Sequence, residues 1–196
     1  MLHIVYGGSA SGKSSYAESF AMSLQGEGRL LYIATMYPYK WNTTEIDPET
    51  MQRIERHRAM RADKGFDTVE CYRHVEHIVA KWQDVLLLEC MSNLLANEMY
   101  LEPDSNAGSD MAETMSPVSN KIVQALIDLS TRVQELVIVT NDVFSDGGSL
   151  TYDESTREYV KNLAEINCAL ARVAETVTEV VCGIPVIVKK NHPMGK

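Results

Sequence analysis

The chain has 196 residues, of which 45% are hydrophobic, and it carries a formal net charge of −9. This acidic balance argues against a nucleic-acid partner, because polynucleotides are bound mainly through Lys and Arg side chains that neutralise phosphates. Length and composition predict one globular domain over residues 1–196. No run of about 18 apolar residues indicates a membrane-spanning helix, and the first residues show no secretion signal.

Short apolar runs alternate with segments of helical periodicity along the chain. The predicted strands are 2–6, 30–34, 84–90, 135–140, 177–182 and 184–189, and the predicted helices are 14–25, 50–62, 73–83, 92–101, 116–133 and 155–176. Near-continuous apolar strands separated by helices indicate a mostly parallel sheet covered on both faces, which is a three-layer α/β fold. Only Gly183 separates the last two runs, which predicts a tight antiparallel hairpin at the sheet edge. Pro, Gly, Asn and Ser predict irregular loops at about 37–49 and 102–117.

The chain contains four cysteines, Cys71, Cys90, Cys168 and Cys182, and they show no C-x-x-C spacing. Cys90 and Cys182 lie in or beside apolar runs. This pattern favours reduced, buried thiols over disulfides or zinc ligands, and therefore the cytoplasm as the compartment.

Residues 7–14 match the phosphate-binding pattern G-x-x-x-x-G-K-[ST]. The glycines let backbone N–H groups turn inward, Lys13 reaches the β- and γ-phosphates, and Ser14 offers its hydroxyl to Mg²⁺. A predicted strand before the loop and a helix after it favour this interpretation over a surface turn, and the helix adds its positive N-terminal end. The predicted phosphate-binding residues are Gly7, Gly8, Ser9, Ala10, Ser11, Gly12, Lys13 and Ser14.

Such a loop needs a carboxylate at the end of a neighbouring strand to hold Mg²⁺ directly or through water. Glu89 follows four apolar residues and is the first candidate; the alternative is a solvated carboxylate at a strand end. Asp142 is a second candidate, because ligands bind at the carboxyl ends of strands in open α/β sheets. Asn141 and Asp142 could equally form a turn.

His57 stands among arginines in the predicted helix 50–62, with Arg53, Arg56, Arg58 and Arg61 nearby. One interpretation is a charged, solvent-facing helix with an incidental histidine. The other is that the arginines gather around nucleotide phosphates while a neutral imidazole attacks phosphorus. The spacing leaves both open.

An ordered set of motifs resembles the family of bifunctional adenosylcobinamide kinases and adenosylcobinamide-phosphate guanylyltransferases of cobalamin assembly. The motifs are GGSASGKS at 7–14, LYIAT at 31–35, RIERHR at 53–58, TVE at 68–70, LLLEC at 86–90, NLL at 93–95, VTND at 139–142 and CGIPV at 182–186. The likeness covers nearly the whole chain, and the ordered set is far more specific than any one motif. It implies a RecA-like P-loop fold, commonly a homotrimer, acting on a corrinoid with ATP or GTP.

The resemblance also implies roles for particular residues. His57 matches the histidine that becomes guanylylated, and Glu89 and Glu70 match acidic positions of the nucleotide site. Further nucleotide contacts are implied at Ala34, Thr35, Met36, Arg58, Ala59, Met60 and Arg61.

Together with these residues, the resemblance implies two reactions. The γ-phosphoryl group of the nucleotide first passes to the aminopropanol hydroxyl of adenosylcobinamide. His57 then attacks the α-phosphorus of GTP, and the GMP group moves on to adenosylcobinamide phosphate. Two alternatives remain: a P-loop kinase of another small molecule in which His57 is structural, and a non-enzymatic nucleotide switch.

Overall fold

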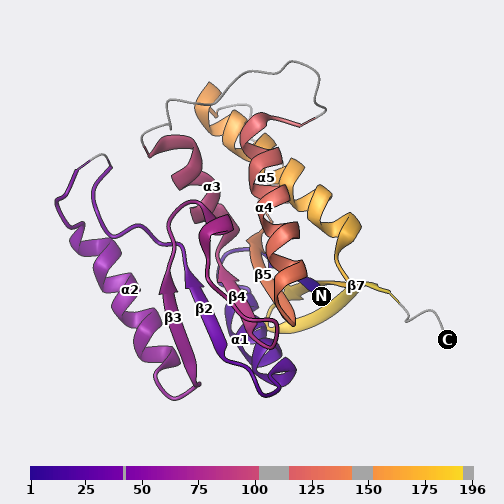
Figure 1. The fold of residues 1–196 in the computed structure, drawn as a ribbon. Coiled ribbons are helices and arrows are strands. Elements are labelled where there is room, and N and C mark those ends of the chain that lie inside the picture. Colours follow the sequence, from indigo (N-terminus) through magenta and orange to yellow (C-terminus); the bar gives the residue numbers. More distant parts are fainter. Residues whose placement is uncertain (42, 102–114, 143–151, 192–196) are drawn as a thin grey trace.

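Figure 1 shows the computed structural model, which describes residues 1–41, 43–101, 115–142 and 152–191. Its elements in chain order are β1 (Leu2–Gly7), α1 (Lys13–Leu24), β2 (Leu30–Ala34), α2 (Pro48–Arg61), β3 (Phe66–Glu70), the 3₁₀ turn η1 (Val75–His77), β4 (Val85–Glu89), α3 (Met91–Tyr100), α4 (Pro117–Arg132), β5 (Glu135–Asn141), α5 (Glu154–Val173), β6 (Thr176–Val181) and β7 (Ile184–Lys190).

One seven-stranded sheet runs through the described chain in the order β3-β2-β4-β5-β1-β6-β7. Every neighbouring pair is parallel except β6 and β7, which form an antiparallel hairpin at the edge. Strand β5 lies between β1, which leads into the glycine-rich loop, and β4, which ends at Glu89. The predicted three-layer α/β fold, with a mostly parallel sheet, a glycine-rich loop between β1 and α1 and a C-terminal edge hairpin, is confirmed.

Apolar side chains of the strands alternate between the two faces of the sheet, so both faces need a cover. On one face Leu86 packs in a cluster with Leu126 of α4 and Ile166 of α5. On the other face Leu87 packs in a cluster with Ala17 of α1. Helices on both faces make the three layers visible in Figure 1.

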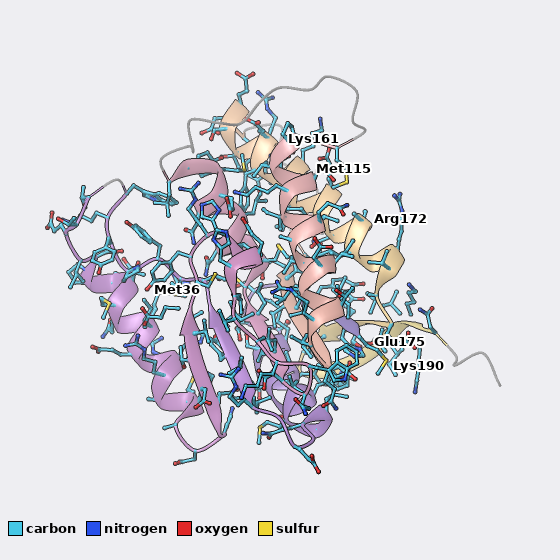
Figure 2. The ribbon with its side chains drawn as sticks, in the orientation of Figure 1. Met36, Met115, Lys161, Arg172, Glu175 and Lys190 are labelled. Carbon is cyan, nitrogen blue, oxygen red and sulfur yellow. The ribbon has the colours of Figure 1, made fainter. Side chains whose placement is uncertain are left out.

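Helix α5 illustrates how the periodicity fixes a face. It buries Leu163, Ile166 and Leu170, which are spaced three and four residues apart. Lys161 and Arg172 extend from the opposite side into solvent (Figure 2). Within the described residues, no helix is both long and apolar enough to cross a bilayer.

The predicted helix at 73–83 is wrong, because only the 3₁₀ turn Val75–His77 forms there. Val75 and Ile78 are still buried against the core. Arg132 of α4 donates to the carbonyl of Glu76 at 3.2 Å and to that of Ile78 at 3.4 Å. A tertiary contact thus satisfies carbonyls that a helix would have used itself.

Strand β3 is absent from the predicted elements. Its sequence, Phe66–Glu70, is mostly polar and exposed, so no apolar run marks it. It forms because its backbone pairs in register with β2, from Leu30 opposite Phe66 to Ala34 opposite Glu70. An edge strand of this kind is specified by its neighbour more than by its own hydrophobicity.

The turn of the C-terminal hairpin consists of Cys182 and Gly183, with φ of 50° and 82°. Two successive residues with positive φ are typical of a type I′ turn. This turn exposes Cys182, and Cys168 is also exposed, so the prediction that these thiols are buried is wrong. All four cysteines are unpaired, as expected. The cytoplasmic location stays a prediction.

The predicted loop at 37–49 is irregular, as expected, over its described residues. Among the described residues of 37–49, one isolated bridge joins Tyr39 to Ile46, and the rest is irregular until α2 begins at Pro48. Asp47 caps that helix by accepting from the backbone N–H of Glu49. Most of the loop at 102–117 lies outside the described residues.

Candidate active site

The glycine-rich loop adopts a shape that its sequence requires. A Cβ on Gly7 would lie 2.6 Å from the Val180 carbonyl oxygen, and Gly12 has a φ of +91°. The backbone N–H of Gly183, in the hairpin turn, donates to the carbonyl of Ser11 at 2.8 Å. The loop is therefore held between the start of α1 and the edge hairpin.

Lys13 opens α1 and is buried, with 8% of its surface exposed. Its ammonium group donates to the Gly8 carbonyl at 3.0 Å, across the loop. A lysine held in this position presents its charge to an anion seated against the loop N–H groups.

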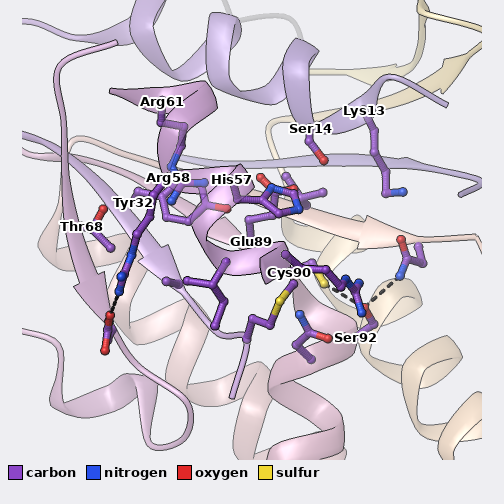
Figure 3. Close-up of a pocket in the computed structure, with 18 of the residues that line it drawn as sticks. Lys13, Ser14, Tyr32, His57, Arg58, Arg61, Thr68, Glu89, Cys90 and Ser92 are labelled. Atoms are coloured by element: carbon purple, nitrogen blue, oxygen red, sulfur yellow. Dashed lines mark hydrogen bonds and ion pairs between the residues drawn. The ribbon is translucent and has the colours of Figure 1, made fainter. Parts of the chain in front are cut away.

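A cavity of about 460 Å³ lies beside the loop, and Figure 3 shows its lining. Many of the predicted site residues meet there, although they come from three strands, two helices, the glycine-rich loop and the segments that follow β2 and β5. They are Ser9, Lys13, Ser14, Ala34, Met36, His57, Arg58, Arg61, Glu70, Glu89 and Asp142. The histidine of α2 and the lysine of the glycine-rich loop thus face one space.

Glu89 ends β4 in this cavity, and its Oε2 is buried and has no hydrogen-bond partner among the described residues. Tyr32 lines the same cavity, where its phenol lies within the electrostatic influence of the Glu89 carboxylate. Burial raises the pKa of Tyr32 well above its usual range, and the charge of Glu89 raises it further. The phenol therefore stays protonated and adds no negative charge to the cavity.

The residues present fit a magnesium ion. The orphaned Glu89 oxygen and the Ser14 hydroxyl line the same cavity, and Mg²⁺ takes oxygen ligands, commonly one or two carboxylates together with substrate phosphates and water. No cluster of three or more His, Cys, Asp or Glu side chains suited to a metal occurs among the described residues. A single carboxylate and a hydroxyl suit a metal that arrives with a nucleotide.

Arg61 is buried on the α2 side of the cavity, with 6% of its surface exposed. Its guanidinium carbon lies 3.4 Å from the centre of the Tyr32 ring, so the charge rests on an aromatic face. Its Nε and Nη1 have no hydrogen-bond partner among the described residues. Buried donors without partners are costly, and a phosphate would satisfy both.

Glu70, at the end of β3, is engaged on both carboxylate oxygens. One oxygen forms an ion pair with Arg58 of α2, and the other accepts from the Tyr72 hydroxyl at 2.8 Å. Burial raises the pKa of Tyr72, and the hydrogen bond to Glu70 raises it further. Glu70 thus links α2 to the sheet.

The remaining predicted residues lie outside the cavity lining. Thr35 is fully buried, and its hydroxyl donates to the carbonyls of Glu89 at 3.0 Å and Cys90 at 2.9 Å. Ala59 and Met60 are exposed on α2. Gly7, Gly8, Ala10, Ser11 and Gly12 shape the loop beside the cavity.

Sequence reasoning missed several residues that line the cavity. Tyr32 has the pattern of a core residue in a buried strand, and Thr68 lies on the strand that was not predicted. Position at or just after a strand end could have indicated Cys90, Ser92 and Asn141. The missed residues are Tyr32, Ile54, Thr68, Tyr72, Cys90, Ser92, Asn93, Val139 and Asn141, while Arg53, one of the arginines noted around His57, also lines the cavity.

Residues 3–188 match the model of the CobU family, described as cobinamide kinase / cobinamide phosphate guanyltransferase. The chain belongs to the cobinamide kinase / cobinamide phosphate guanyltransferase family. The family that the ordered motifs predicted is thereby confirmed. The prediction that the protein is an enzyme of this family is confirmed as well.

Two curated relatives are similar to this chain over their whole length. Both are named bifunctional adenosylcobalamin biosynthesis protein CobU. The protein of Escherichia coli (strain K12) is 30% identical over 198 residues, which cover 96% of this chain and 100% of the relative. That of Salmonella typhimurium (strain LT2) is 30% identical over 197 residues, again 96% of this chain and 100% of the relative.

Solved structures of other proteins resemble this chain more distantly. The flagellar accessory protein FlaH from Methanocaldococcus jannaschii aligns with a TM-score of 0.48 and 14% identity, over 97% of this chain and 78% of its own. The P4 protein from bacteriophage phi6, in complex with ADP, aligns with a TM-score of 0.41 and 11% identity, over 94% and 53%. At such scores neither likeness indicates a function.

Proposed function

We propose that residues 1–196 act as one nucleotide-binding domain that carries out two reactions in the cytoplasm. The first phosphorylates adenosylcobinamide with ATP or GTP, and the second transfers GMP from GTP to adenosylcobinamide phosphate. The observation that carries the proposal is that Lys13, His57 and Arg61 face one cavity. A phosphate-binding lysine and a histidine flanked by arginines are the groups that these two transfers need.

The kinase step needs positioning and charge stabilisation. The loop N–H groups and Lys13 hold the β- and γ-phosphates, so that the substrate hydroxyl can attack the γ-phosphorus. The bond from that phosphorus to the β-γ bridging oxygen breaks, and the nucleoside diphosphate leaves. Ser14 and Glu89 would hold Mg²⁺, which neutralises charge on the phosphates when bound.

The guanylyl transfer needs a nucleophile. A neutral imidazole nitrogen of His57 attacks the α-phosphorus of GTP, forms a P–N bond and expels pyrophosphate. A phosphate oxygen of adenosylcobinamide phosphate then attacks the same phosphorus and releases His57, giving adenosylcobinamide-GDP. Arg61, with two buried donors free of partners among the described residues, is suited to the charge that develops.

Further nucleotide contacts are proposed from the family resemblance. Ala34 and Met36 line the cavity beside Arg58 and Glu70, which supports them as neighbours of the nucleotide. Thr35, Ala59 and Met60 would act from adjacent positions.

A homotrimer is proposed as the assembly. Edge strand β7 exposes Ile184, Ile187 and Val188, which are 65%, 61% and 57% accessible. An apolar edge of this kind favours a covering partner. Light scattering that finds a fully active monomer would remove the trimer from the proposal.

Intact-protein mass spectrometry after mixing with GTP and Mg²⁺ tests the proposal. We expect one added GMP per chain, through a P–N bond that acid cleaves and base spares. His57→Asn should lose the adduct and the second reaction yet keep corrinoid phosphorylation. His77→Asn, which alters an exposed histidine outside this cavity, is the matched control and should keep the adduct.

The contrary outcomes are distinct. An undiminished adduct in His57→Asn would move the nucleophile to another residue. No adduct in the parent protein, with corrinoid phosphorylation intact, would favour a simple kinase.

A further inference from the structure

Aromatic side chains form a connected row near the cavity, which we call the aromatic cluster: Tyr37, Tyr39, Trp41, Tyr72 and Tyr100. The ring centroid of Tyr37 lies 5.4 Å from Tyr39, 6.5 Å from Trp41 and 5.4 Å from Tyr72. Trp41 lies 6.2 Å from Tyr100, edge to face. These distances are within the range of favourable ring contacts.

The outer members of the cluster are exposed to solvent. Trp41 is 52% accessible, and Tyr39 and Tyr100 are each 38% accessible. Tyr100, at the end of α3, joins the loop after β2 to the start of α5, because its ring contacts Trp41 and its hydroxyl lies beside that of Ser155. A group of exposed aromatic rings beside a catalytic cavity indicates a binding surface.

A groove of about 520 Å³ runs between Trp41 and Tyr100. Its other lining residues are Ala96, Ser155, Thr156 and Tyr159. The Tyr100 hydroxyl lies 2.9 Å from the Ser155 hydroxyl. The groove therefore combines aromatic walls, a small residue that leaves room, and hydroxyl groups at the margin.

The groove is joined to the phosphate cavity along α3. Ser92, Ala96 and Tyr100 are spaced four residues apart, so they follow one face of the helix. Ser92 lines the cavity, while Ala96 and Tyr100 line the groove. The Tyr159 hydroxyl donates to the Ser92 carbonyl at 3.2 Å. Eight residues of helix place the two sites about 12 Å apart.

We infer that this groove binds the corrin macrocycle of the acceptor while its aminopropanol arm extends along α3 into the phosphate cavity. The inference rests on the proposed function. A cavity of about 460 Å³ that receives a nucleoside triphosphate has no room for a macrocyclic acceptor as well, so the bulk of the acceptor has to lie outside it. Only the terminal hydroxyl has to reach the γ-phosphorus.

The chemistry of the acceptor matches the groove. The exposed Trp and Tyr rings offer a large apolar contact area to a macrocycle, and amide groups at its periphery can pair with the hydroxyls of Ser155 and Thr156. The inferred residues bind and position the acceptor and take no part in the bond changes.

Steady-state kinetics with cobinamide and ATP, together with equilibrium dialysis of cobinamide, test the inference on the full chain. Trp41→Ala should raise the KM and Kd for cobinamide by about tenfold or more, as loss of an aromatic stacking partner does. The KM for ATP should stay within about twofold. Trp41→Phe, which keeps a ring, should restore most of the affinity.

Trp82→Ala is the matched control. Trp82 is 67% accessible but precedes β4, at the end of the strands opposite the cavity. It should leave the KM for cobinamide unchanged.

Three outcomes separate the possibilities. Unchanged cobinamide KM and Kd in Trp41→Ala, with an active parent, would overturn this inference alone. A Trp41→Ala variant that changes the mass found by light scattering would assign the cluster to a subunit contact and also overturn it. A parent that binds cobinamide through Trp41 but never phosphorylates it would support the groove and refute the proposed kinase reaction.

Discussion

The two walls of the phosphate cavity differ in how they are attached to the protein. The wall made by the glycine-rich loop and α1 belongs to the core: α1 buries Ala17 and Ala21 against the sheet, and the edge hairpin is hydrogen-bonded to the loop. The wall made by α2 is largely solvated, since Arg61 is the one buried residue among its 14. Arg61 stacked on Tyr32, together with the Arg58 to Glu70 ion pair, ties it to β2 and β3.

This difference separates two kinds of contribution. Phosphate binding by the loop follows from folding of the whole sheet, so it is disturbed only by changes that also strain the core or remove Lys13. The histidine on α2 depends on a few polar contacts. A single substitution in α2 can therefore alter the guanylyl transfer while the fold and the kinase step persist.

The largest expected effect concerns the loop wall. Lys13→Ala should lower the rate of corrinoid phosphorylation by about two to three orders of magnitude, because it removes preorganised charge from the transferring phosphate. A coupled assay of nucleoside diphosphate release measures it, and circular dichroism verifies folding. Lys161→Ala, a 73% exposed lysine side chain on α5, is the control. Near-parent activity in Lys13→Ala would show that the glycine-rich loop does not stabilise the transferring phosphate.

A smaller effect is expected on the α2 wall. Arg61→Ala should slow formation of the GMP adduct by roughly tenfold to a hundredfold, because two buried guanidinium donors are lost. Corrinoid phosphorylation should change by less than about threefold. Quenched-flow mass spectrometry gives the adduct rate, and Arg61→Lys should recover only part of it, since an ammonium lacks the planar fork.

Arg56→Ala, which alters an exposed arginine of the same helix, serves as the control for Arg61→Ala. If Arg61→Ala slows both reactions equally, both walls act on the same phosphates. That outcome would contradict the division of the kinase step and the guanylyl transfer between the two walls.

The smallest effect separates packing from chemistry in the loop. Gly7→Ala should lower the free energy of unfolding by about 1–3 kcal/mol, because the new Cβ would lie 2.6 Å from a backbone oxygen of β6. Gly8→Ala is a matched control, since a Cβ there meets no atom within 4 Å. Urea denaturation of both variants measures the difference. Equal stability in Gly7→Ala would show that the hairpin can shift away from the loop.

Local patterns of residues specify several parts of this protein. Buried parallel strands are near-continuous apolar runs, so β1, β2, β4 and β5 were predicted within about two residues. The glycine-rich loop carries its own constraint, because Gly12 needs a positive φ and Lys13 must begin a helix. The family followed from the order of the motifs, and the fold followed with it.

Other features could not be predicted from local patterns, because they depend on partners far away in the chain. Strand β3 exists through pairing with β2, and the segment at 73–83 loses its helix to hydrogen bonds from Arg132. Helical spacing does not predict which arginine of α2 is buried. Arg61 is buried because its guanidinium group stacks on the Tyr32 ring. Strand pairing and ring stacking join residues that are far apart in the sequence, so they cannot be predicted from a run of neighbouring residues.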